Sequence, residues 1–78
     1  MVDGHSTPTL SVGALQELRR IYVKHLLEVF ASPETQELYE RGCISGRFAT
    51  APGAERPASF IVDRVTPLGV AVLEHVER

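Results

Sequence analysis

The sequence has one cysteine, Cys43, and no tryptophan among its 78 residues. A single thiol excludes an internal disulfide. The three histidines stand too far apart along the chain to supply the closely spaced ligand pairs of a structural zinc site. A chain of this length buries only about 60% of the surface that it exposes when unfolded. The sequence therefore predicts one small domain that depends on packing, or on a partner subunit, for its stability.

Long apolar runs and a basic excess are also missing. No stretch approaches the roughly 20 apolar residues of a transmembrane helix, and residues 1–9 lack the basic start and apolar centre of a signal peptide. Together with the free thiol, this predicts a cytoplasmic protein that does not enter a membrane. Ten acidic residues outnumber eight basic ones, for a net charge of −2. A nucleic-acid-binding role would therefore need a local basic patch.

No catalytic, metal-binding or cofactor-binding signature is present. Cys43 stands between Gly42 and Ile44 without a local nucleophile motif, and a buried structural thiol is the favoured interpretation. His25 and Glu28 are three residues apart, but no second ligand pair accompanies them. The glycines do not form a phosphate-binding pattern. We expect a protein that is not an enzyme and carries no cofactor.

The first half of the domain is predicted to be a long helix. Residues 1–10 are rich in glycine, proline, serine and threonine and predict a loose arm. From Ser11, a suitable N-cap, to Phe30, apolar residues recur at spacings of three and four, as on one face of a helix. That face comprises Val12, Leu15, Leu18, Tyr22, Leu26 and Val29. Four further apolar residues widen the surface beyond one stripe and predict a homodimer interface: Ile21, Val23, Leu27 and Phe30.

The second half predicts a short helix, a hairpin and a last helix. Ser32-Pro33 is a helix start, and Gly42 can adopt the left-handed conformation that ends the helix. Residues 43–48 and 58–65 predict two strands joined by a loop of about nine residues, and Thr66-Pro67 begins the last helix. The expected fold is α+β, one domain over residues 11–78. Its predicted core is Leu15, Leu18, Tyr22, Leu26, Val29, Leu38, Ile44, Phe48, Phe60, Val62, Leu68, Val72 and Leu73.

Two segments of the second half resemble the winged-helix family. The stretch from Leu38 to Ile44 (LYERGCI) is similar to the junction between a recognition helix and the first wing strand. The stretch from Val65 to Leu73 (VTPLGVAVL) is similar to the phrase that follows the second wing strand. The resemblance covers residues 33–76 and implies a winged-helix-like fold with a DNA-binding role.

A small dimeric DNA-binding transcriptional regulator is the function that the resemblance implies. The helix in the recognition position carries three glutamates against one arginine, so we expect duplex DNA to be contacted elsewhere. An arginine at a wing tip can enter the minor groove. The predicted DNA-binding residues are Arg47 and Arg56 on the hairpin, with Arg19, Arg20 and Lys24 on the first helix.

A protein-interaction or inhibitor module, of the kind that phages and mobile elements encode, is the alternative. Its acidic short helix would face a basic protein partner through Glu34, Glu37 and Glu40. Tyr39 is either a residue at the edge of the core or an anchor in this interface. The net charge and the glutamates favour this alternative, whereas the hairpin and the Thr66-Pro67-Leu68-Gly69 phrase favour DNA.

Overall fold

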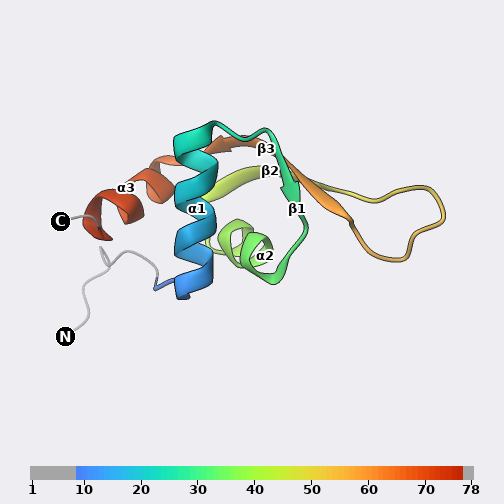
Figure 1. Ribbon diagram of the computed structural model, residues 1–78, viewed down its shortest axis with the longest axis horizontal. Helices are drawn as coiled ribbons and strands as arrows, with labels where there is room; N and C mark the ends of the chain where they lie inside the picture. The colour runs from blue at the N-terminus through green and yellow to red at the C-terminus, as the bar shows by residue number, and fades with distance from the viewer. Residues whose placement is uncertain (1–8, 77–78) are drawn as a thin grey trace.

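The computed structural model describes residues 9–76 and contains three helices and three strands in this range. Figure 1 shows them in chain order: α1 (Val12–Lys24), β1 (Glu28–Phe30), α2 (Pro33–Glu40), β2 (Ile44–Ala49), β3 (Ser59–Val65) and α3 (Pro67–Val76). The strands form one antiparallel sheet, so the α+β class is confirmed. The predicted sheet of two strands is wrong, because a third strand, β1, pairs with β3.

α1 ends at Lys24 and does not continue to Phe30 as predicted. His25 adopts a left-handed conformation (φ 54°), and its N–H donates to the carbonyl of Ile21. A left-handed residue stops a right-handed helix and redirects the chain. The segment after it becomes β1, in which Val29 is buried and its two neighbours are exposed. The apolar residues that recur at helical spacing in the sequence therefore do not belong to one helix: Leu26 follows α1, and Val29 lies in β1.

The sheet has the strand order β1-β3-β2, with β3 in the centre. Its buried face holds Val29, Ile44, Phe60 and Val62. Ile44 pairs with Val65 and Gly46 pairs with Val62, so β3 carries one extra residue between these pairs. This bulge explains why two successive residues of β3, Asp63 and Arg64, are both exposed. The alternation of buried and more exposed residues along β3 consequently holds only up to the bulge.

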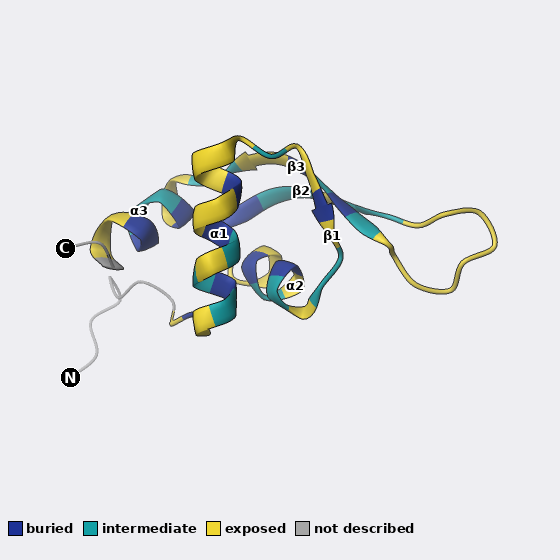
Figure 2. Cartoon of the chain, viewed as in Figure 1, coloured by how far each residue is buried: buried dark blue, intermediate teal, exposed yellow. Residues whose placement is uncertain are grey.

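The core lies between this face of the sheet and the helices, as the dark blue segments of Figure 2 show. It contains Leu10, Ala14, Leu18, Ile21, Val29, Leu38, Cys43, Ile44, Phe60, Val62, Val72 and Leu73. The predicted core residues Leu15, Leu26 and Phe48 are only partly buried. Tyr22 and Leu68 were predicted to be buried and are exposed at 45% and 39%, which corrects the predicted buried face of each helix.

Two further predictions are wrong: Leu10 was assigned to the loose N-terminal arm, and Ile21 was assigned to a dimer interface. Leu10 and Ile21 lie in the core. The side chain of Ile21 is 1% exposed because its turn of α1 faces the sheet. Residues 1–8 of the predicted arm lie outside the described residues.

The predicted helix starts are confirmed by side-chain caps. Ser11 Oγ accepts a hydrogen bond from the N–H of Ala14, and Ser32 Oγ accepts one from the N–H of Thr35. Thr66 Oγ1 accepts from the N–H of Gly69. Each cap satisfies a backbone donor that the first turn of a helix leaves unpaired. The turn after α2 is also as predicted, with Gly42 at φ 77°.

Thr66 also ties the start of α3 to the start of β2. Its hydroxyl donates to the carbonyl of Gly42 (2.5 Å), and its N–H donates to the carbonyl of Cys43 (3.0 Å). A Cβ on Gly69 would clash with the same Cys43 carbonyl, so only glycine permits this close approach. These contacts fix α3 against the end of the sheet opposite the hairpin loop (Figure 1).

No helix within residues 9–76 is long and apolar enough to cross a membrane.

Candidate nucleic-acid interface

The outward face of α2 and the base of the hairpin loop border one hollow of the fold. α2 turns Thr35 and Leu38 into the core, so Pro33, Gln36 and Glu40 point outward. Gln36 Nε2 donates to Glu40 Oε2 at 3.0 Å, which orients both side chains along the helix. We call this surface, together with Arg56 and the exposed Arg41 at the C-terminal end of α2, the α2–hairpin surface.

Two of the three α2 glutamates face α1 instead of this surface. Glu37 accepts hydrogen bonds from the backbone N–H of Ser11 (2.8 Å) and from its hydroxyl (2.9 Å). These bonds, with a smaller contribution from Arg41, lower the pKa of the Glu37 carboxyl below its ordinary value. Glu34 lies against Gly13, where an added Cβ would stand 3.1 Å from Glu34 Cγ. The N-terminus of α1 thus receives the negative charge that its helix dipole favours.

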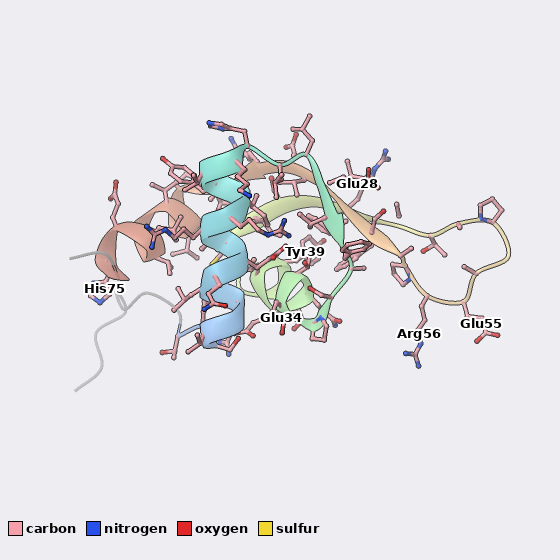
Figure 3. All side chains as sticks on the ribbon, viewed as in Figure 1. Glu28, Glu34, Tyr39, Glu55, Arg56 and His75 are labelled. Carbon is pink, nitrogen blue, oxygen red and sulfur yellow. The ribbon has the colours of Figure 1, made fainter. Side chains whose placement is uncertain are left out.

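The base of the hairpin loop, near Arg56, borders the same hollow as α2. All residues of the loop from 50 to 58 are exposed. The base of the loop is fixed by two backbone hydrogen bonds, from Ala58 N–H to Ala49 and from Ala31 N–H to Ala58. Arg56 then borders a hollow that is lined by Ala31, Pro33, Gln36, Phe48 and Pro57. Figure 3 shows Glu55 and Arg56 projecting from the loop, away from the helices.

The other predicted DNA-binding cations lie on different parts of the surface. Arg19 borders a hollow between α1 and α3, and Arg20 borders one between α1 and β1. Arg20 also pairs with Glu17 at 2.7 Å, which offsets its charge. Lys24 is exposed in the last turn of α1. Arg47 points from β2 on the uncovered face of the sheet, so the five predicted cations do not line one common hollow.

Tyr39 lies at the edge of an aromatic cluster. Its ring centroid is 5.5 Å from that of Phe48 and 5.4 Å from that of Phe60, and the rings of Phe48 and Phe60 are 4.8 Å apart. Edge-to-face and tilted arrangements at these distances are favourable. Tyr39 is nevertheless 44% exposed, so its ring packs against the edge of the core and is also in contact with solvent.

The predicted apolar interface on the first helix is divided between elements. Val23 on α1 is 62% exposed, Leu27 follows α1 at 72%, and Phe30 on β1 is 82% exposed. Ile21, which was grouped with them, is buried as described above. The remaining three therefore do not form a stripe on one helix.

The Cys43 thiol is poorly suited to nucleophilic chemistry. It is fully buried, and burial raises its pKa above the ordinary value. A buried, protonated thiol is a poor nucleophile and a poor metal ligand. Within residues 9–76, no group of three or more His, Cys, Asp or Glu side chains is arranged to hold a metal ion.

No family model, curated protein or solved structure matches this chain significantly.

Sequence reasoning missed Gln36 as a member of the α2–hairpin surface. The signal was present in the spacing of Pro33, Gln36 and Glu40, which places these residues on one side of a helix. It could be used only once the buried side of α2, with Thr35 and Leu38, was known.

Proposed function

We propose that the protein is a winged-helix-like, non-enzymatic module that binds duplex DNA through the α2–hairpin surface. The observation that carries the proposal is the position of Glu37 and Glu34 at the N-terminus of α1. Their placement leaves Glu40 as the α2 glutamate on the outward face, beside Gln36. An outward Gln is a residue type that pairs with base edges in the major groove.

The charge of this surface predicts weak and salt-sensitive binding. Arg41 and Arg56 supply two positive charges, and Glu40 and Glu55 supply two negative ones, so the formal sum is zero. The affinity of a protein for the phosphate backbone of DNA grows with the number of phosphates that its cations neutralise. The surface of one chain therefore provides about two phosphate contacts, and two copies on one duplex would bind more tightly than one.

The test is a titration of a fluorescently labelled random duplex, followed by anisotropy at low and rising salt. We expect binding at low salt that weakens as salt rises. Arg41→Ala with Arg56→Ala should weaken binding and flatten the salt dependence by about two units, because each lost phosphate contact removes about one. Glu40→Gln should strengthen binding, and Glu37→Gln should leave it unchanged.

Arg64→Ala is the matched control, because Arg64 is an exposed arginine at the other end of β3. It removes the same charge from the chain without touching the proposed surface. Equal loss of binding in Arg64→Ala and Arg56→Ala would show that only net charge matters and would contradict the proposed site. Absence of binding at low salt would reject the DNA-binding function.

A protein-interaction or inhibitor module is the second candidate. It is favoured by the exposure of Val23, Leu27 and Phe30 and by the net charge of −2. The acidic helix α2 offers a basic partner fewer carboxylates than the sequence predicted, since Glu37 is hydrogen-bonded to Ser11 and Glu34 lies against Gly13. This candidate predicts no binding to DNA at any salt concentration and loss of a partner complex in Glu40→Gln.

A further inference from the structure

The helices leave one face of the sheet uncovered, and we call it the outer face. Where all three strands pair, it presents six side chains in two rows that follow the register of the strands; beyond these rows β3 carries the exposed Asp63 and Arg64. The first row is Glu28, Ile61 and Arg47, and the second is Phe30, Ser59 and Ala49. We propose that the outer face binds the outer face of a second copy of this chain and forms a symmetric homodimer.

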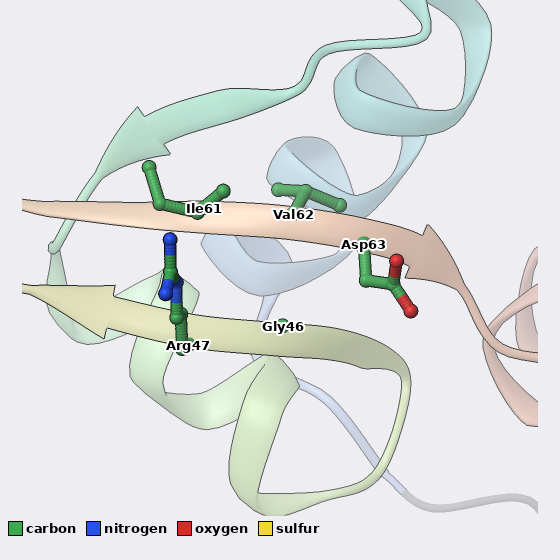
Figure 4. A pocket seen from close by; sticks show the side chains of 5 residues that line it. All are labelled: Gly46, Arg47, Ile61, Val62 and Asp63. Atoms are coloured by element: carbon green, nitrogen blue, oxygen red, sulfur yellow. The ribbon is translucent and has the colours of Figure 1, made fainter.

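The first row is self-complementary in charge. Glu28 on β1 and Arg47 on β2 flank Ile61 on the central strand (Figure 4 shows Arg47 and Ile61 on neighbouring strands). A two-fold axis that runs parallel to β3 between two facing sheets exchanges the left and right sides of this row. Glu28 of each copy then faces Arg47 of the other, and Ile61 faces Ile61. In a two-fold interface each contact occurs twice, so the pairing forms two ion pairs.

The second row is self-complementary in size under the same axis. Phe30 is the largest residue of the outer face and is 82% exposed, whereas Ala49 and Ser59 on the other two strands are small. The axis places Phe30 of each copy over Ala49 of the other. The ring would then be covered by a partner surface with room for it, as in sheets that pack face to face.

Glu28 and Arg47 are free to make these contacts. Neither side chain forms a hydrogen bond or an ion pair with another residue in the range 9–76. An acceptor and a donor left open on either side of an apolar centre match a copy of the same surface better than a uniformly charged partner.

This arrangement leaves the α2–hairpin surface uncovered. Because the axis runs along the strands, the hairpin loops of both copies extend from the same end of the dimer. Dimer formation does not depend on DNA, so the inference can fail or succeed independently of the proposed function.

The experiment is sedimentation equilibrium of the full chain in the absence of DNA, over micromolar to millimolar concentrations. Wild type should show a reversible equilibrium between the 8.6 kDa monomer and a dimer. Glu28→Arg alone and Arg47→Glu alone each place like charges opposite one another twice, and each should weaken dimerisation by about tenfold or more. The double variant, with both changes in one chain, should restore the wild-type equilibrium.

Mixing the two single variants provides the decisive measurement. A Glu28→Arg chain faces an Arg47→Glu chain with Arg against Glu on one side and Arg against Glu on the other. The mixture should therefore form heterodimers although each variant alone is mainly monomeric. An effect confined to one chain, such as partial unfolding, cannot be repaired by mixing.

Two matched controls carry the same charge changes on the hairpin loop. Glu55→Arg and Arg56→Glu should dimerise as wild type does, because both residues lie off the outer face. Phe30→Ser should lose dimerisation without losing monomer stability, because Phe30 is exposed in the single chain. A wild type that stays monomeric at millimolar concentration would overturn the proposal, as would a dimer that persists unchanged in Glu28→Arg and Arg47→Glu.

Discussion

At the scale of single residues, the contacts of Glu37 change how the acidic character of the short helix is interpreted. The sequence places it among three glutamates that give the short helix an acidic character. The structure joins its carboxylate to the N–H and hydroxyl of Ser11, which also caps α1. One carboxylate thus connects the two helices and meets the positive end of α1.

This contact predicts a pH-dependent contribution to stability. The hydrogen bonds lower the pKa of Glu37 in the folded state, so its contribution is present above the unfolded-state pKa and is lost as pH falls through the folded-state pKa. We expect Glu37→Gln to lower the melting temperature at neutral pH, and the difference from wild type to shrink in acid. Thermal melts across this pH range measure it. Glu55→Gln, in the exposed loop, should match wild type at every pH.

At the scale of elements, α1 is held by the residues that face the sheet. Leu18 and Ile21 are at most 1% exposed, whereas Leu27, just beyond the helix, is 72% exposed. Leu26, which the sequence placed on the buried face of the helix, follows the end of α1 and is only partly buried. The burial of α1 therefore depends on its first three turns.

The prediction at this scale compares two leucines with opposite environments. Leu18→Ala should lower the free energy of unfolding by about 2–5 kcal/mol, because it removes a fully buried side chain and leaves a cavity. Leu27→Ala should change it by no more than about 0.5 kcal/mol. Urea denaturation of both variants provides the measurement, and similar values for the two would contradict the burial that the structure assigns to α1.

At the scale of the whole molecule, the hairpin determines the shape. The extents are 47 × 27 × 19 Å, and the loop projects along the longest axis (Figure 1). The radius of gyration is 13.1 Å, whereas a compact domain of this length has about 11.5 Å. The projecting segment from position 50 to position 58 contains no buried residue.

We predict that this loop serves binding and not stability. Replacing residues 50–57 by Asn-Gly gives a two-residue hairpin turn between Ala49 and Ala58, whose backbone groups already bond. The free energy of unfolding, measured in urea, should change by less than about 1 kcal/mol, since a shorter loop costs slightly less entropy to close. Binding to duplex DNA should be lost with Arg56. A variant that fails to fold would show instead that the loop is part of the fold.

The part of the fold that the sequence predicts well is local in origin. Ser11, Ser32 and Thr66 cap helices that begin where their side chains reach the first free N–H groups, and such contacts span only three residues. β1 was missed because a strand of three residues has little sequence pattern of its own. It exists through its pairing with β3, about 30 residues further along the chain.

The candidate site was predictable only in part for a similar reason. The sequence identified Arg56 and the hairpin that carries it, but it grouped Arg56 with cations that fold onto other surfaces. The direction in which a glutamate of α2 points depends on how α1 packs against α2. That packing angle is not encoded in the spacing of residues within either helix.

The sequence by itself determined the α+β composition, the helix starts and the hairpin, because caps, turns and strand-forming residues act over a few neighbours, and its single cysteine excluded an internal disulfide. Only the tertiary structure decided where α1 ends and which glutamates remain outward. It also decided that Glu28, Ile61 and Arg47 stand in one row across three strands. Such a row joins residues far apart in the chain, and strand pairing alone brings them together.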